Sequence, residues 1–132
     1  MSNQDQGKIS ILRRQYEALD RGDFDAAMEI LHPEVEFTRP GAAPLRGAAA
    51  LRAWLEPDAL VDQRWKAKEF RVNGDKVLVR QNTEARGAGS GIELDVDTWA
   101  LWTLNGDGLV TRIEGFLIHE ESAAVEAAGL SE

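Results

Sequence analysis

The segment IELDVDTWALWTL, residues 92–104, decides the fold because its two faces change character along its length. Alternate residues of a strand point to opposite faces of a sheet. The even positions are apolar apart from Thr98, so this face is predicted to meet the helices of the protein. The odd positions are acidic as far as Asp97 and become apolar at Trp99 and Leu101. Something must therefore cover Trp99 and Leu101 as well.

Turn signals on both sides of this segment delimit further strands. Asn-Gly-Asp occurs at residues 73–75 and again at 105–107, and a glycine-rich stretch fills residues 86–91. Asn-Gly between apolar runs is the strongest short hairpin signal. Because the turns are short, neighbouring strands are predicted to be antiparallel. We expect four strands, over about 65–72, 76–86, 92–104 and 109–118.

The first half of the chain shows helical spacing of its apolar residues instead. Gly22 suits the left-handed position after a first helix, and Asp23 suits the N-cap of a second. PGAAP, residues 40–44, is predicted to be a loop. The helices are expected over 8–21, 24–31, about 47–56 and 122–128, with a strand over 35–39. We expect one domain over 1–132, with a flexible N-terminus over 1–7 and a short helix and tail over 119–132.

Helices segregated from an antiparallel sheet predict an α+β fold. Three helices cover only one face of a curved sheet, so the outer face needs another partner. The simplest partner for Trp99 and Leu101 is a second copy of the chain, which predicts a homodimer through this face. Two alternatives remain open, namely that these side chains are exposed or that the C-terminal tail covers them.

Composition excludes several classes of function. The net charge is -8 with a pI of about 4.8, so we expect binding neither to nucleic acid nor to anionic membranes. There is no cysteine, and the two histidines lack the spacing of a metal motif. We therefore predict no metal and no cofactor. The polar N-terminus and the absence of a run of about 18 apolar residues predict a cytoplasmic protein.

Three stretches carry a family resemblance. They are YEALDRGDFDAAMEILHPEVEF (16–37), PLRGAAALRAWL (44–55) and GLVTRIEGFLIHEESAAVEAAGL (108–130). Together they resemble the nuclear transport factor 2-like superfamily, most closely its SnoaL-like, polyketide-cyclase-like branch. The resemblance implies a cone-shaped α+β barrel, in which a curved sheet wraps three helices around a deep pocket, and often a homodimer. It does not choose a function, because the superfamily includes isomerases, cyclases, epoxide hydrolases, dehydratases and noncatalytic binding domains.

Strand parity predicts which side chains reach such a pocket. Gln81, Thr83 and Thr98 are polar residues on inward faces, and Arg39 shares a face with Val35 and Phe37. Trp54 and Trp102 supply aromatic wall. An apolar pocket with a few converging polar groups is the usual make-up of a small-molecule site.

Each of these residues also has a purely structural interpretation. The three polar residues could hydrogen-bond to one another or to buried water. Arg39 could pair with Glu36 or Glu56 or turn to solvent. The two tryptophans could belong to the core.

Catalytic groups are harder to place. Relative to the isomerase branch, the base position holds Arg39, which stays protonated, and the acid position falls near Ala100. The epoxide hydrolase triad is also missing. Tyr16 and His119 remain candidates for a proton carrier. Two hypotheses stay open: a binding protein for a small apolar or anionic organic molecule, and a cofactor-independent acid/base enzyme of the cyclase, isomerase or dehydratase type.

Overall fold

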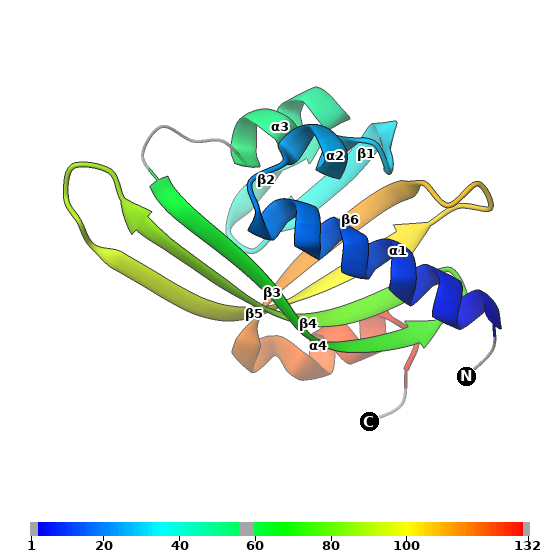
Figure 1. Cartoon of the computed structure of the whole chain (residues 1–132). Coiled ribbons are helices and arrows are strands. Elements are labelled where there is room, and N and C mark those ends of the chain that lie inside the picture. The colour runs from blue at the N-terminus through cyan, green and yellow to red at the C-terminus, as the bar shows by residue number, and fades with distance from the viewer. Residues whose placement is uncertain (1–2, 56–59, 131–132) are drawn as a thin grey trace.

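The computed structural model describes residues 3–55 and 60–130 (Figure 1). Within these ranges, no helix combines the length and apolar character needed to cross a membrane. The elements, in chain order, are α1 (Asn3–Asp20), α2 (Phe24–Met28), β1 (Leu31–Arg39), β2 (Ala42–Arg46), α3 (Ala48–Leu55), β3 (Leu60–Asn73), β4 (Lys76–Gly87), β5 (Glu93–Leu104), β6 (Val110–Leu117), the 3-10 turn η1 (Ile118–Glu120) and α4 (Glu121–Ala127).

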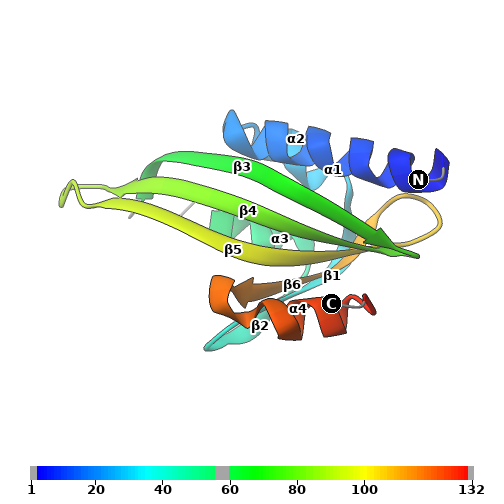
Figure 2. The ribbon, with the colours of Figure 1, turned by 90° about the horizontal axis from the view of Figure 1, so that it is seen from below.

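The strands form one six-stranded sheet in the order β2-β1-β6-β5-β4-β3. Only the β1–β6 pair is parallel, and the other pairs are antiparallel. The sheet is curved and open, with β2 and β3 as its edges (Figures 1 and 2). The α+β class, the curved and mostly antiparallel sheet, and the meander from β3 to β6 are confirmed, although the barrel does not close.

Several element boundaries differ from the sequence predictions. α1 begins at Asn3, so the N-terminal segment expected to be flexible is helical from that residue. The predicted loop over 40–44 contains the start of β2, which forms because Phe37 and Leu45 pair across β1 and β2. β3 begins at Leu60 rather than at residue 65. Propensity alone does not reveal a short strand that depends on its neighbour for hydrogen bonds.

The predicted junction between the first two helices is confirmed. Gly22 adopts a left-handed backbone conformation with φ of 75°. The side chain of Asp23 then accepts a hydrogen bond of 3.1 Å from the backbone N–H of Ala26, which caps α2. This turn sends α2 back towards α3 and sets the start of β1.

The main core lies between the concave face of the sheet and the helices α1, α2 and α3. Leu12 and Leu19 of α1 and Leu51 of α3 pack there against Val79 of β4 and Trp102 of β5. Burial of each such side chain contributes roughly 1.5–3 kcal/mol. The apolar stripe of α1 predicted from spacing is thus the surface that holds the first helix to the sheet.

A second cluster covers the opposite, convex face of the sheet. α4 lies against this face, away from α1 (Figure 2), and its residues Ala124 and Val125 pack with Leu78, Trp99 and Leu101. Trp99 is 2% exposed and Leu101 is 0% exposed, and the indole N–H of Trp99 donates to the backbone carbonyl of Ile118 at 3.2 Å.

The prediction that a second copy covers Trp99 and Leu101 is therefore wrong. The chain's own C-terminal helix covers them, which is the alternative that the tail covers this face. A homodimer through these two side chains would require α4 to leave the sheet, because both are already removed from solvent within one chain.

The helices of the described residues leave one part of the concave face uncovered. The strands β4 and β5 run past the helices towards the hairpin that joins them (Figure 1). Four apolar side chains of this part are exposed. Three of them stand at the start of the segment 92–104, namely Ile92 (64%), Leu94 (47%) and Val96 (52%), and the fourth is Leu117 of β6 (43%). The prediction that the even face meets the helices is therefore wrong for residues 92–96, because the strands are longer than the helical layer.

Candidate functional site

A chain of hydrogen bonds crosses the concave face from its buried part to its open part. The indole N–H of Trp102 donates to the hydroxyl oxygen of Tyr16 at 3.1 Å, and that hydroxyl donates to Oε1 of Gln81 at 2.5 Å. Nε2 of Gln81 donates to Oγ1 of Thr98 at 3.1 Å. The structure thus brings Gln81, Thr98 and Trp102, three of the predicted binding residues, together with Tyr16. Gln81 and Thr98 hydrogen-bond to each other, which is the purely structural interpretation considered from the sequence.

Thr83 lies on the same face but outside this chain. It pairs in register with Val96 of β5 and with Trp65 of β3. Its side chain has no hydrogen-bond partner among residues 3–55 and 60–130. Because Val96 beside it is largely exposed, Thr83 borders the open part of the concave face.

Arg39 lies at the end of β1 in an aromatic setting. Its guanidinium carbon lies 5.5 Å from the ring centroid of Trp54 and 5.7 Å from that of Phe37, and the two rings meet edge to face with centroids 4.9 Å apart. Such contacts favour a cation and hold its plane in place. One terminal nitrogen donates to the carbonyl of Ala43 at 3.1 Å.

No described carboxylate forms an ion pair with Arg39. Glu36, one of the partners considered from the sequence, pairs instead with Arg46 and Arg112, and Glu56, the other, lies outside the described residues. Nε of Arg39 is buried without a hydrogen-bond partner among the described residues. Among residues 3–55 and 60–130, the guanidinium therefore brings to this edge of the face a positive charge that no carboxylate compensates.

The acidic side chains of β5 lie on the other side of the sheet. Asp97 accepts a hydrogen bond of 2.8 Å from the side chain of Asn82, and it also pairs with Lys68 and Arg80. The hydrogen bond from Asn82, helped by these two cations, lowers the pKa of Asp97. Asp97 is therefore an ionised carboxylate of the convex face and is badly placed to move a proton on the concave face.

The two candidate proton carriers are also poorly suited to acid/base work. Tyr16 is 3% exposed, and its burial raises the pKa of its hydroxyl well above the ordinary value. Ionisation of this hydroxyl is therefore harder than that of an exposed tyrosine. His119 is exposed in η1, next to the Ile118 carbonyl that caps the indole of Trp99 on the convex side. The structure does not bring His119 together with the concave face.

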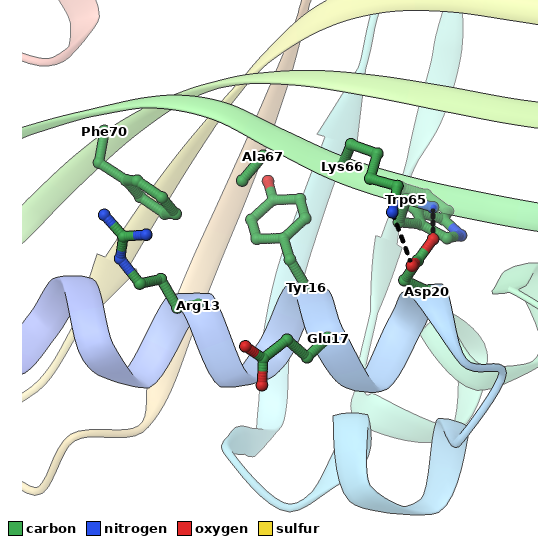
Figure 3. Close-up of a pocket in the computed structure, with 8 residues that line it drawn as sticks. All are labelled: Arg13, Tyr16, Glu17, Asp20, Trp65, Lys66, Ala67 and Phe70. Atoms are coloured by element: carbon green, nitrogen blue, oxygen red, sulfur yellow. Dashed lines mark hydrogen bonds and ion pairs between the residues drawn. The ribbon is translucent and has the colours of Figure 1, made fainter.

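A cavity of about 190 Å³ lies between α1 and the edge strand β3 (Figure 3). Tyr16 is the only predicted candidate that lines it. The Arg13 guanidinium lies 5.1 Å from the ring centroid of Phe70, while Glu17 points away from the strand (Figure 3). The full lining is Arg13, Tyr16, Glu17, Asp20, Trp65, Lys66, Ala67 and Phe70.

Asp20 closes one end of this cavity and ties α1 to β3. Its carboxylate accepts from the backbone N–H of Trp65 at 2.8 Å, from Arg64 at 2.9 and 3.1 Å, and from Lys66 at 3.2 Å. These hydrogen bonds, with that of Arg64 the strongest cause, lower the pKa of Asp20 below its ordinary value of 3.8.

Asp20→Asn is expected to lower the free energy of unfolding by about 1–2 kcal/mol at pH 7, because it removes the charge from these bonds. The depressed pKa stabilises the fold above the unfolded-state pKa near 3.8, and this contribution is lost as pH falls towards the folded-state pKa. Urea unfolding at pH 7 and at about pH 3 should therefore show a smaller difference in the free energy of unfolding between Asp20→Asn and wild type at the lower pH. Asp107→Asn, in an exposed turn, is the control. If Asp20→Asn lowers the free energy of unfolding by the same amount at both pH values, the role assigned to the Asp20 carboxylate is contradicted.

Sequence reasoning missed two features of the site. The aromatic contacts of Arg39 were not predicted, although Phe37 stands two residues away and so shares its face; nothing in the sequence places Trp54 of α3 beside both. The cavity between α1 and β3 was also missed, because it depends on how closely a helix packs on a sheet edge.

Comparison with known proteins places this geometry in a family. The family model of the SnoaL-like domain matches residues 12–113. No curated protein matches the chain. The structure is similar to the epoxide hydrolase/cyclase-like enzyme SalBIII of salinomycin pyran ring formation, with a TM-score of 0.78 and 18% identity over 88% of this chain and 93% of that one.

Two further solved structures share the fold. An NTF2-like protein of unknown function from Burkholderia pseudomallei K96243 has a TM-score of 0.74 and 21% identity, over 92% of this chain and 95% of that one. RV0760c from Mycobacterium tuberculosis, in complex with estradiol-17beta-hemisuccinate, has a TM-score of 0.70 and 13% identity, over 81% and 90%. The chain is a member of the SnoaL-like domain family and has its nuclear transport factor 2-like cone fold.

Proposed function

We propose that this protein binds a small, mostly apolar organic anion on the open part of its concave face. The carrying observation is the guanidinium of Arg39, which has no carboxylate partner among the described residues and lies against Phe37 and Trp54. An anionic group on the ligand would supply the missing partner through charge-assisted hydrogen bonds. The apolar body of the ligand would lie on the exposed side chains of Val96 and Leu117.

The composition of the face favours binding over acid/base catalysis. The inward positions of β4 and β5 from residue 77 to 85 and from 94 to 104 carry no carboxylate and no histidine. Burial raises the pKa of Tyr16 further above neutrality, so its hydroxyl gives up its proton less readily, and a guanidinium does not take up a proton near neutral pH. The complex of RV0760c with estradiol-17beta-hemisuccinate supports a small-ligand role for this fold.

Electrostatics also suits an anion at this position. The chain as a whole carries a net charge of -8, which repels anions at a distance. A cation on a partly desolvated surface, such as Arg39 without a carboxylate partner in the described part of the chain, interacts much more strongly with an anion than the same charge in bulk water. The proposed site therefore selects anions by contact with Arg39 rather than by long-range attraction.

Isothermal titration calorimetry with 2-naphthoate and its neutral analogue 2-naphthamide tests the proposal. The two probes share the same ring system, so the difference between their affinities isolates the charge. We expect 2-naphthoate to bind about 10- to 100-fold more tightly, the range of a charge-assisted hydrogen bond. Equal affinities, or no heat from either probe, would contradict the proposed function.

A further inference from the structure

The hydrogen-bond chain on the concave face has a fixed direction. The indole of Trp102 is a donor only, so the oxygen of Tyr16, 3.1 Å away, accepts from it. The hydroxyl proton of Tyr16 must then find its own acceptor in a buried environment. Among the described residues that acceptor is Oε1 of Gln81, so the carbonyl end of the Gln81 amide faces Tyr16.

The opposite orientation of this amide would be costly. If the NH2 group of Gln81 faced Tyr16, the hydroxyl oxygen of Tyr16 would lie between two donors, this NH2 group and the indole of Trp102. The hydroxyl proton of Tyr16 would then have no acceptor in the core. The raised pKa of Tyr16 keeps this proton in place across the neutral range. The donor-only indole of Trp102 thus determines the orientation of Gln81 from the far side of Tyr16.

The fixed amide determines what Thr98 offers to a ligand. Nε2 of Gln81 points towards Thr98 and donates to its Oγ1 at 3.1 Å. The hydroxyl of Thr98 is therefore an acceptor within the chain. Its own proton has no acceptor among residues 3–55 and 60–130. Each link donates in the same direction, which polarises the last hydroxyl and strengthens it as a donor.

We propose that the hydroxyl of Thr98 recognises a neutral acceptor, such as a ketone carbonyl, on the ligand that Arg39 holds by its anionic end. This inference rests on the proposed function. Tyr16 and Trp102 are positioning residues, because they prevent Thr98 from turning its proton towards Gln81. The open part of the face thus presents donors at both ends of the ligand, and the ligand class is an apolar anion with a distant carbonyl group.

The sheet register sets the separation of the two groups. Thr98 pairs with Leu117 of β6, while Thr38 of β1 pairs with Glu114, which places Arg39 two strands away and about two residues along. Strand spacing and rise put the two backbone positions roughly 10–12 Å apart. A flat two-ring ligand with substituents at opposite ends spans the gap that remains between the side chains.

Titration of 6-acetyl-2-naphthoate and 6-ethyl-2-naphthoate tests this inference, because the two differ only in the carbonyl. Wild type should bind the ketone about three- to tenfold more tightly, as expected for one neutral hydrogen bond. Thr98→Val should abolish this preference and Thr98→Ser should keep it. Thr103→Val, on the convex side of the same strand, is the control and should also keep it.

Tyr16→Phe tests the positioning role. Without the donor from Tyr16, Gln81 is free to turn its carbonyl towards Thr98 and to take up the threonine proton. The ketone preference should then fall as in Thr98→Val, and the infrared carbonyl stretch of the bound ketone should move up towards its value in an aprotic solvent in both variants. Equal binding of the two naphthoates by wild type, or a preference that survives Thr98→Val, would overturn the inference and leave the proposed function standing if binding still needs Arg39. Failure of both naphthoates to bind would overturn both.

Discussion

Val125→Asp is expected to lower the free energy of unfolding by about 3 kcal/mol or more, since it places a charge in an apolar contact. Val125 is buried between α4 and the convex face of the sheet, where it packs with Leu78, Trp99 and Leu101. Undocking of α4 would expose these three side chains together. Urea unfolding followed by tryptophan fluorescence measures the loss of stability, and light scattering should show the exposed patch driving association.

Ala123→Asp is the matched control for this substitution. Ala123 lies on the same short helix but faces solvent, so its replacement should change stability by less than about 0.5 kcal/mol. Equal effects of the two substitutions would mean that α4 does not hold the convex face. They would also reopen the question of what covers Trp99.

Arg39→Gln is expected to remove most of the preference for an anion. The affinity for 2-naphthoate should fall by about 10- to 100-fold, while that for 2-naphthamide should change by less than about threefold. Glutamine keeps a polar side chain of moderate length but carries no charge and does not present the planar guanidinium that lies against Phe37 and Trp54. Titration calorimetry of both probes on both proteins measures the effect.

Two further variants sharpen this comparison. Arg46→Gln removes an arginine from the neighbouring strand β2, where the side chain is 81% exposed and pairs with Glu36, and it should leave both affinities unchanged. Arg39→Lys keeps the positive charge but lacks the planar guanidinium, so the affinity for 2-naphthoate should fall by an intermediate factor. If Arg39→Gln weakens the two probes equally, or if Arg46→Gln acts like it, the assigned role of Arg39 is incorrect.

Much of the fold follows from local patterns in the sequence. The alternation of side chains along the strands over residues 76–104 placed Gln81, Thr98 and Trp102 on one face. In the structure, hydrogen bonds that include Tyr16 connect these three side chains. This works because the period of a strand is fixed by the backbone. The junction at Gly22 was equally predictable, because few residues adopt a left-handed conformation without strain.

The sequence patterns did not predict in the same way which element packs against each face of the sheet. The odd face of β5 needed a partner, but the sequence did not reveal whether that partner is a second chain or α4. The residues that dock α4 include the small side chains of Ala124 and Ala128, which give a weak periodic signal. The exposed stretch from residue 92 to 96 depends on the length of the strands relative to the helices, which is a tertiary property.

The crystal structure of the wild-type protein with 2-naphthoate tests the central assignment most directly. We expect the carboxylate to lie within hydrogen-bond distance of the Arg39 guanidinium, with the rings against Val96 and Leu117. The assignment would be contradicted by a ligand seated in the cavity between α1 and β3 beside Arg13, with the concave face empty.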